Sequence, residues 1–116
     1  MTWDDMLAIG LKLLHIEAAT SYGTPALKVR GKLITRLRAE DDSLVLHSVP
    51  PDEREILFAA DPRVFHITTH YEGYPAVLGR LVALETVSLW PLLLRRWREV
   101  APDRAVASFD AAQAKS

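Results

Sequence analysis

The chain has 116 residues and a formal net charge of −1 at pH 7, and 49% of its residues are hydrophobic. These values are ordinary for a soluble globular domain. The absence of cysteine excludes a disulfide framework, thiolate metal ligands and a cysteine nucleophile. Asp4 and Asp5 stand where a signal peptide needs positive charge, and no apolar run approaches the roughly 18 residues of a membrane span. We therefore expect a soluble, cytoplasmic monomer with no membrane partner.

A helix is predicted from about Trp3 to about Ala18. Thr2 can cap it, and Asp5 stands three residues further on, in the place of a capping-box acid. Four apolar residues then recur at helical spacing, namely Met6, Ile9, Leu13 and Ile16. Gly10 costs this helix up to ~1 kcal/mol relative to alanine, which suggests that another backbone approaches closely there.

The segment that follows Pro25 predicts a β-hairpin over residues 26–38, and alternation allows two registers for it. The first has a two-residue turn of Gly31 and Lys32, and would pair Leu27 with Arg36. The second has a three-residue loop of residues 30–32, and its pairs are Val29 with Leu33 and Leu27 with Thr35. We favour the second register, because it separates apolar from basic side chains and lets Gly31 supply the positive φ that the loop needs.

In the favoured register one face of the hairpin is aliphatic, with Leu27, Val29, Leu33 and Leu37. The other face carries Lys28, Arg36 and Arg38, with Ile34 among them, and two more cations, Arg30 and Lys32, lie at the tip. Five basic residues and no acid therefore lie between residues 28 and 38. The remainder of the chain is acidic, so the positive charge is concentrated on this one hairpin.

Residues 43–49 predict a third strand, central in its sheet because apolar residues occupy both faces. A helix then opens at residues 50–51, where proline and acids suit the first turn, and it ends near Ala60. Residues 64–69 and 76–84 predict the fourth and fifth strands.

The last helix is expected to begin with Ser88 as its cap. A start at Thr86 would place Pro91 in the hydrogen-bonded interior, at a cost of about 3 kcal/mol. The buried stripe of this helix consists of Leu89, Leu93, Trp97 and Val100. Residues 103–116 are expected to form a flexible C-terminal tail.

The predicted order is helix, three strands, helix, two strands and helix. It indicates a single α+β domain over residues 1–102, an antiparallel sheet of about five strands with helices packed on one face. Two segments support this prediction of the fold. The first is residues 21–25 (Ser-Tyr-Gly-Thr-Pro), which leads into the hairpin, and the second is residues 69–75 (Thr-His-Tyr-Glu-Gly-Tyr-Pro). Together they resemble the MmcQ/YjbR family of small bacterial proteins, over about residues 5–102. The resemblance implies a CyaY-like fold, similar to frataxin, and DNA as the partner.

The basic hairpin is the leading candidate site. Its cations could follow phosphates along a groove, and three tyrosines of the two loops could add stacking. The candidate nucleic-acid-binding residues are Lys28, Arg30, Lys32, Arg36, Arg38, Tyr22, Tyr71 and Tyr74. Five phosphate contacts on a duplex give a salt slope near −4, at roughly −0.9 per contact, which predicts weak, largely nonspecific binding. The structural alternative is a solvated sheet face whose cations prevent edge pairing.

Other site chemistry is weaker. His66 and His70 were candidates for a metal site, but zinc usually needs three or four protein ligands. Ser21, Thr24, His70 and Glu72 show no spacing that fixes a nucleophile and its base. We therefore expect no catalytic residue, no metal and no cofactor, and a protein that is not an enzyme. The alternative function is a small-ligand or protein-partner module that uses the cleft between the loops at residues 22–25 and 70–75.

Overall fold

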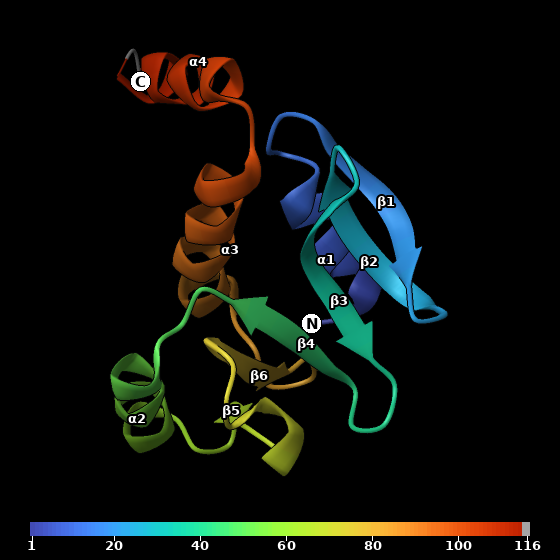
Figure 1. Cartoon of the computed structure of the whole chain (residues 1–116), viewed down its shortest axis with the longest axis vertical. Coiled ribbons are helices and arrows are strands. Elements are labelled where there is room, and N and C mark those ends of the chain that lie inside the picture. Colours follow the sequence, from blue (N-terminus) through green and yellow to red (C-terminus); the bar gives the residue numbers. More distant parts are fainter. Residues whose placement is uncertain (115–116) are drawn as a thin grey trace.

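The computed structural model describes residues 1–114 and contains four α-helices around one antiparallel sheet (Figure 1). The helices are α1 (Trp3–Gly10), α2 (Pro51–Ala60), α3 (Thr86–Val100) and α4 (Asp103–Ala114), and a short 3-10 helix, η1, spans Thr69–Tyr71. The strands are β1 (Ile16–Ser21), β2 (Thr24–Val29), β3 (Lys32–Arg38), β4 (Ser43–His47), β5 (Phe65–His66) and β6 (Ala76–Arg80). No helix in the described part of the chain is long and apolar enough to cross a membrane.

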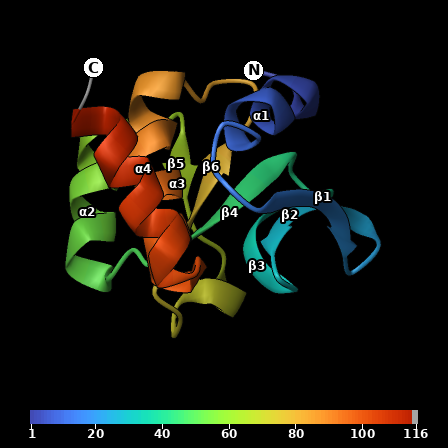
Figure 2. The ribbon, with the colours of Figure 1, turned by 90° about the horizontal axis from the view of Figure 1, so that it is seen from above.

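The six strands lie in the order β1-β2-β3-β4-β6-β5, and all neighbours are antiparallel. The predicted α+β class is therefore confirmed, with one strand and one helix more than expected. Strands β1–β3 curl away from α2, α3 and α4, which gather at the opposite side of the molecule (Figure 2).

The first helix is shorter than predicted. Its capping box is present, since Thr2 N–H donates to the Asp5 carboxylate (2.9 Å) and Asp5 N–H to the Thr2 hydroxyl (3.2 Å). The helix ends at Gly10, however, and residues 16–21 form β1. Leu13 and Ile16 are buried because a turn and then a strand bring them into the same core. A Cβ on Gly10 would meet Cδ1 of Leu27, so a side chain rather than a backbone makes the close approach there.

The hairpin follows neither predicted register in full. Its turn consists of Arg30 (φ +49) and Gly31 (φ +80), two positive-φ residues that suit the twist of a two-residue hairpin. Leu27 pairs with Thr35 as predicted, but a bulge between Leu27 and Lys28 shifts the next pairs. Lys28 therefore lies opposite Leu33, and Val29 opposite Lys32.

This bulge changes which side chains reach the core. Ile34 is buried in the main core, although we expected it among the cations, and Leu33 lies on the other side of the sheet. Leu37 packs against the core and Arg36 faces away from it, as predicted. Strict alternation failed because β3 holds one extra residue, Ile34, between the partners of Leu27 and Lys28, and this reverses which face the side chains beyond it occupy.

The middle of the chain agrees with the prediction. Leu44, Val45 and Leu46 of β4 are buried on both faces of the sheet, so β4 is a central strand. Helix α2 has proline in its first turn. The fourth strand is shorter than expected, because the chain leaves β5 after His66 and turns into η1.

The C-terminal part differs most from the prediction. Helix α3 begins at Thr86, and Glu85 provides no side-chain cap, so Pro91 lies inside the helix. Because proline has no N–H, the helix lacks the hydrogen bond from residue 91 to the carbonyl of Val87. Val87 is exposed to water. The buried stripe is confirmed for Leu89, Leu93 and Trp97.

In place of the expected flexible tail, residues 103–114 form α4. Phe109 packs with its ring centroid 5.4 Å from that of Trp97, and the Arg98 guanidinium binds both carboxylate oxygens of Asp110 at 2.6 and 3.1 Å. Residues 115 and 116 lie outside the described part of the chain.

Several long-range bonds fasten α3 and the N-terminus to distant segments. The indole N–H of the buried Trp97 donates to the carbonyl of Leu14 (2.9 Å). The Arg96 Nε–H donates to the carbonyl of Leu33 in β3 (3.0 Å), and the terminal amine of Met1 donates to the carbonyl of Leu81 (2.9 Å). These contacts fix β3, and the pocket next to it, against α3.

Candidate pocket between two loops and the basic hairpin

A pocket of about 480 Å³ opens on the face of the sheet away from the main core. One wall is Tyr22 of the β1–β2 turn, and the other is formed by residues 70–75 around η1. Leu33 and Arg36 of β3 and Val45 of β4 form its floor together with His47 and Ala76. The two Tyr-Gly-Pro loops that the sequence singled out therefore lie at one pocket, as the alternative function required.

Aromatic rings dominate the second wall. The His70 ring contacts Tyr71 edge to face at 4.9 Å and lies 5.7 Å from Tyr74, between ring centroids. Tyr71 is buried, whereas Tyr74 is 55% exposed and Tyr22, across the opening, is 89% exposed. The pocket thus presents two exposed rings on opposite rims and a fixed ring between them.

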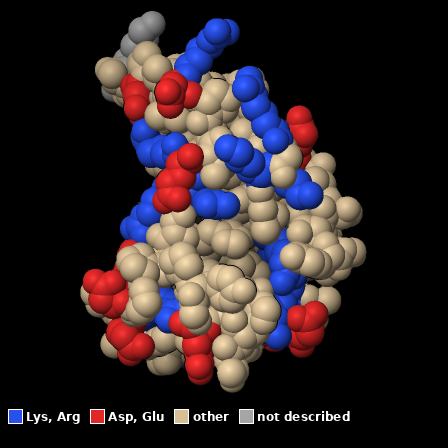
Figure 3. Space-filling model, viewed as in Figure 1, with Lys and Arg blue, Asp and Glu red and all other residues tan. Residues whose placement is uncertain are grey.

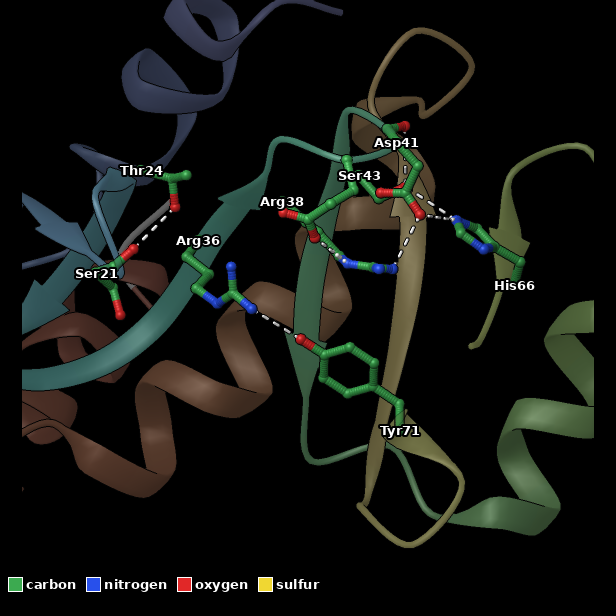
Figure 4. Close-up of polar contacts among 9 residues, drawn as sticks. Ser21, Thr24, Arg36, Arg38, Asp41, Ser43, His66 and Tyr71 are labelled. Atoms are coloured by element: carbon green, nitrogen blue, oxygen red, sulfur yellow. Dashed lines mark hydrogen bonds and ion pairs between the residues drawn. The ribbon is translucent and has the colours of Figure 1, made fainter. Parts of the chain in front are cut away.

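Arg36 joins the two walls. Its Nη2 donates to the phenolic oxygen of Tyr71 (2.9 Å), and its guanidinium carbon lies 5.2 Å from the centroid of the Tyr22 ring (Figure 4). Within residues 1–114, no ion pair engages this guanidinium. The charge of Arg36 is therefore held by neutral aromatic partners and stays available to an anion.

The floor carries further positive potential. Burial, followed by the charges of Arg96 and Arg36, lowers the pKa of His47 to about 4, while Glu99 acts weakly in the other direction. His47 is therefore a neutral imidazole at physiological pH, and its Nε2 is shielded from water without a hydrogen-bond partner. No sequence spacing connects His47 or Arg96 to the two loops.

The wall around η1 is held by a buried cation that the sequence analysis did not identify. Arg54 of α2 is only 6% exposed. Its guanidinium donates to four backbone carbonyls of the second loop and its exit, those of Tyr71 (2.9 Å), Tyr74 (2.9 Å), Ala76 (3.2 Å) and Glu72 (3.2 Å). Arg54 therefore determines where the rings of this wall lie.

Arg38 does not belong to the free cations, which corrects the predicted site. Its Nε lies 2.7 Å from Oε2 of Glu40, and its Nη1 lies 3.1 Å from Oδ2 of Asp41. Both acids stand in the turn directly after β3, so they fold back onto the end of their own strand. One of the five cations of the hairpin is neutralised in this way.

The other hairpin cations differ in their surroundings. Arg30 and Lys32 are exposed at the tip, and within residues 1–114 no acid forms an ion pair with either. Lys28 lies directly opposite Glu17 of β1 in the ladder. Lys and Arg side chains gather over the hairpin and the neighbouring part of α3, and many acids lie around α2 (Figure 3). β1 covers β2, but within residues 1–114 β3 pairs with β4 at Leu37 and Arg38 alone, so the tip half of β3 is a sheet edge on that side.

A serine, a histidine and an aspartate meet at the other end of β3, but they do not form a catalytic triad. Ser43 Oγ lies 2.9 Å from Nε2 of His66, and Oδ2 of Asp41 lies 3.6 Å from that same nitrogen (Figure 4). A triad needs its carboxylate on the opposite ring nitrogen, and Ser43 is fully buried. Burial, followed by the charge of Arg80, lowers the pKa of His66.

The other residues that the sequence offered as candidates either stabilise a turn or lie apart from one another. The Thr24 hydroxyl donates to the carbonyl of Ser21 (2.9 Å), which stabilises the β1–β2 turn. His66 ends β5, and His70 lies in η1, so they do not share a strand face. Among residues 1–114 no three His, Asp or Glu side chains are placed to hold a metal ion.

The fold and the pocket define a small α+β domain with an aromatic pocket that a cationic hairpin borders. Similar sequences occur in mycobacteria. The uncharacterized protein Rv2570 of Mycobacterium tuberculosis and the uncharacterized protein Mb2600 of Mycobacterium bovis are each 31% identical to this chain over 122 aligned residues. The alignments cover 93% of this chain and 95% of each relative, so the chain belongs to the same family as these proteins. No family model and no solved structure matches the chain.

Proposed function

We propose that the protein binds nucleic acid, weakly and with little sequence preference, over the tip of the basic hairpin and the adjoining pocket. One observation carries this proposal, namely that an aromatic pocket and cations without ion pairs lie side by side. The pairing of β2 with β3 brings the cations next to the pocket. Lys28 lies opposite Leu33, and both Leu33 and Arg36 line the pocket. Cationic grooves with aromatic side chains are typical of proteins that bind single strands.

The number of free cations limits the expected affinity. With Arg38 neutralised and Lys28 opposite Glu17, three hairpin cations remain, Arg30, Lys32 and Arg36. Three phosphate contacts correspond to a salt slope of about −2 for a single strand, at roughly −0.7 per contact. The resemblance to the MmcQ/YjbR family, which implies DNA as the partner, points in the same direction and is itself still a prediction.

The test is a fluorescence-anisotropy titration with labelled single-stranded and duplex DNA at several salt concentrations. Lys32→Gln should weaken binding and reduce the salt slope by about 0.7. Arg63→Gln is the matched control, because Arg63 is an exposed cation between α2 and β5, at the far end of the strand order. Absence of binding at low salt by the folded protein, or equal losses in both variants, would contradict the proposal.

A second candidate function is the binding of a small organic ligand in the pocket. The volume favours it, because about 480 Å³ lies within the range of ordinary small-molecule sites. Arg36 favours an anionic ligand, and the rings favour a planar one. Thermal-shift screening with aromatic carboxylates and sulfonates, and with Arg36→Gln as the comparison, tests this function separately from nucleic acid.

A further inference from the structure

The pocket differs from the hairpin in what it can recognise. The hairpin tip offers only charge, which attracts phosphates of any strand. The pocket offers the rings of Tyr22, Tyr71 and Tyr74 and an apolar floor that includes Leu33 and Val45. A planar group must enter it to use these surfaces, and bases within a duplex are not free to do so.

The two exposed rings are placed to contact such a group from opposite rims. Tyr22 is held over the Arg36 guanidinium, and Tyr74 lies beside His70. Tyr71, between them, is fixed by the bond to Arg36 and by the Arg54 contact to its carbonyl. A ring that enters the pocket therefore meets one aromatic side chain, Tyr71, whose position is already set, which lowers the ordering needed on binding.

The charges indicate how a ligand would be oriented. Arg36 lines the pocket, and Arg96 lies close enough to help to lower the pKa of His47. Lys28 lies opposite Leu33, and the cations of the tip continue from there along the hairpin. A molecule with a planar ring in the pocket and a phosphate beside it would meet Arg36 first and the hairpin next.

We infer that the pocket is a base-binding subsite that takes a nucleobase bearing a phosphate, with the base between Tyr22 and Tyr74 and the phosphate at Arg36. This inference rests on the proposed nucleic-acid binding and sharpens it. It makes unpaired strands the preferred form, because a duplex must first unstack and unpair a base. A free nucleotide offers the same chemistry as one unit of a single strand.

The experiment compares four probes by anisotropy and competition: a labelled single-stranded oligonucleotide, the same backbone with abasic sites throughout, the corresponding duplex and a free mononucleotide. Seating of one base should make the normal strand bind about 5- to 150-fold more tightly than the abasic strand, the range measured for single stacking contacts. Tyr74→Ala should reduce the normal strand to the abasic level, while Tyr74→Phe, which keeps the ring, should not.

Tyr22→Asn provides a second variant, because asparagine tolerates the positive φ of residue 22 (+53) and lacks the ring. Salt-dependent binding that is equal for normal and abasic strands, and insensitive to Tyr74→Ala and Tyr22→Asn, would overturn the base subsite and leave the proposed function standing. Failure of every strand to bind would overturn both. A mononucleotide that competes as well as the strand would support the subsite and assign it to free nucleotides.

Discussion

Arg36 and Arg38 stand two residues apart on the same strand, and they have opposite surroundings. Arg36 donates to the neutral phenol of Tyr71 and lies over the ring of Tyr22. Arg38 reaches two carboxylates, those of Glu40 and Asp41. The difference arises because β3 passes from a pocket whose lining, within residues 1–114, includes no acid into the turn that carries Glu40 and Asp41. A run of basic residues in a sequence therefore does not by itself define a charged surface.

The largest effect is expected from removing the cation that holds the aromatic partner of Arg36. Arg54→Met removes the guanidinium from four carbonyls. Those of Tyr71 and Tyr74 keep a backbone N–H donor, and each of the others costs about 1–3 kcal/mol if it stays unsatisfied. We expect a loss of about 4 kcal/mol in the free energy of unfolding, measured by urea denaturation. Arg63→Met, at an exposed position, should change stability by less than about 0.5 kcal/mol. Equal effects of the two variants would contradict the assigned role of Arg54.

The burial of His47 in the pocket floor, together with the charges of Arg96 and Arg36, makes the stability of the protein depend on pH. The pKa of His47 falls from 6.5 to about 4 on folding. Between these values the unfolded chain binds a proton that the folded protein does not, so stability falls as pH decreases from 6.5 towards 4, by at most about 3 kcal/mol. His66 contributes in the same direction.

His47→Leu should flatten this profile in urea denaturation measured across that pH window. His70→Leu, which removes an exposed imidazole from the pocket rim, is the control. A wild-type slope that persists in His47→Leu would show that the pH dependence has another origin.

The difference between Arg36 and Arg38 is tested by making the same substitution at both positions. Arg36→Gln should lower the affinity for a labelled single strand and reduce the salt slope by about 0.7, since one phosphate contact is lost. Arg38→Gln should leave the slope unchanged, because its charge is already compensated. Anisotropy titrations at several salt concentrations measure both. Equal losses in the two variants would mean that the ion pairs of Arg38 open on binding.

The smallest effect is expected from releasing Arg38. Glu40→Gln removes one of its carboxylates from an exposed position, and should raise the affinity for the strand by no more than a few-fold. Glu55→Gln, on the surface of α2, makes the same change in net charge away from the hairpin. Similar gains in the two variants would indicate a general charge effect rather than a local one.

The sequence predicted those features that depend on neighbouring residues. The capping box at Thr2, the buried strand at residues 44–46 and the stripe from Leu89 to Trp97 all follow from local spacing. The first helix was predicted too long because Leu13 and Ile16 continue the helical spacing although they lie in a turn and a strand. The C-terminal helix was missed because its large apolar residues are only Val106 and Phe109, and Phe109 has its partner, Trp97, in another helix.

The candidate site was predictable in part. Both loops and Arg36 follow from the sequence. The acidic turn at residues 40–42 also stands in the sequence directly after Arg38, and it indicates that this cation is neutralised. Arg54 could not be found in this way. In the sequence it resembles a solvent-facing residue of a short helix, and its partners are backbone carbonyls about 20 residues later, which no side-chain pattern reveals.

The bonds that fasten α3 also bear on how the protein matures. The contact between Trp97 and Leu14 spans 83 residues, and the one between Arg96 and Leu33 spans 63. Such contacts raise the contact order and slow folding. During synthesis the first three strands leave the ribosome long before α3 has been made. The hairpin therefore lacks its contact with α3 for most of that time. The pocket and the hairpin beside it can therefore reach their final arrangement only after nearly the whole chain has been made.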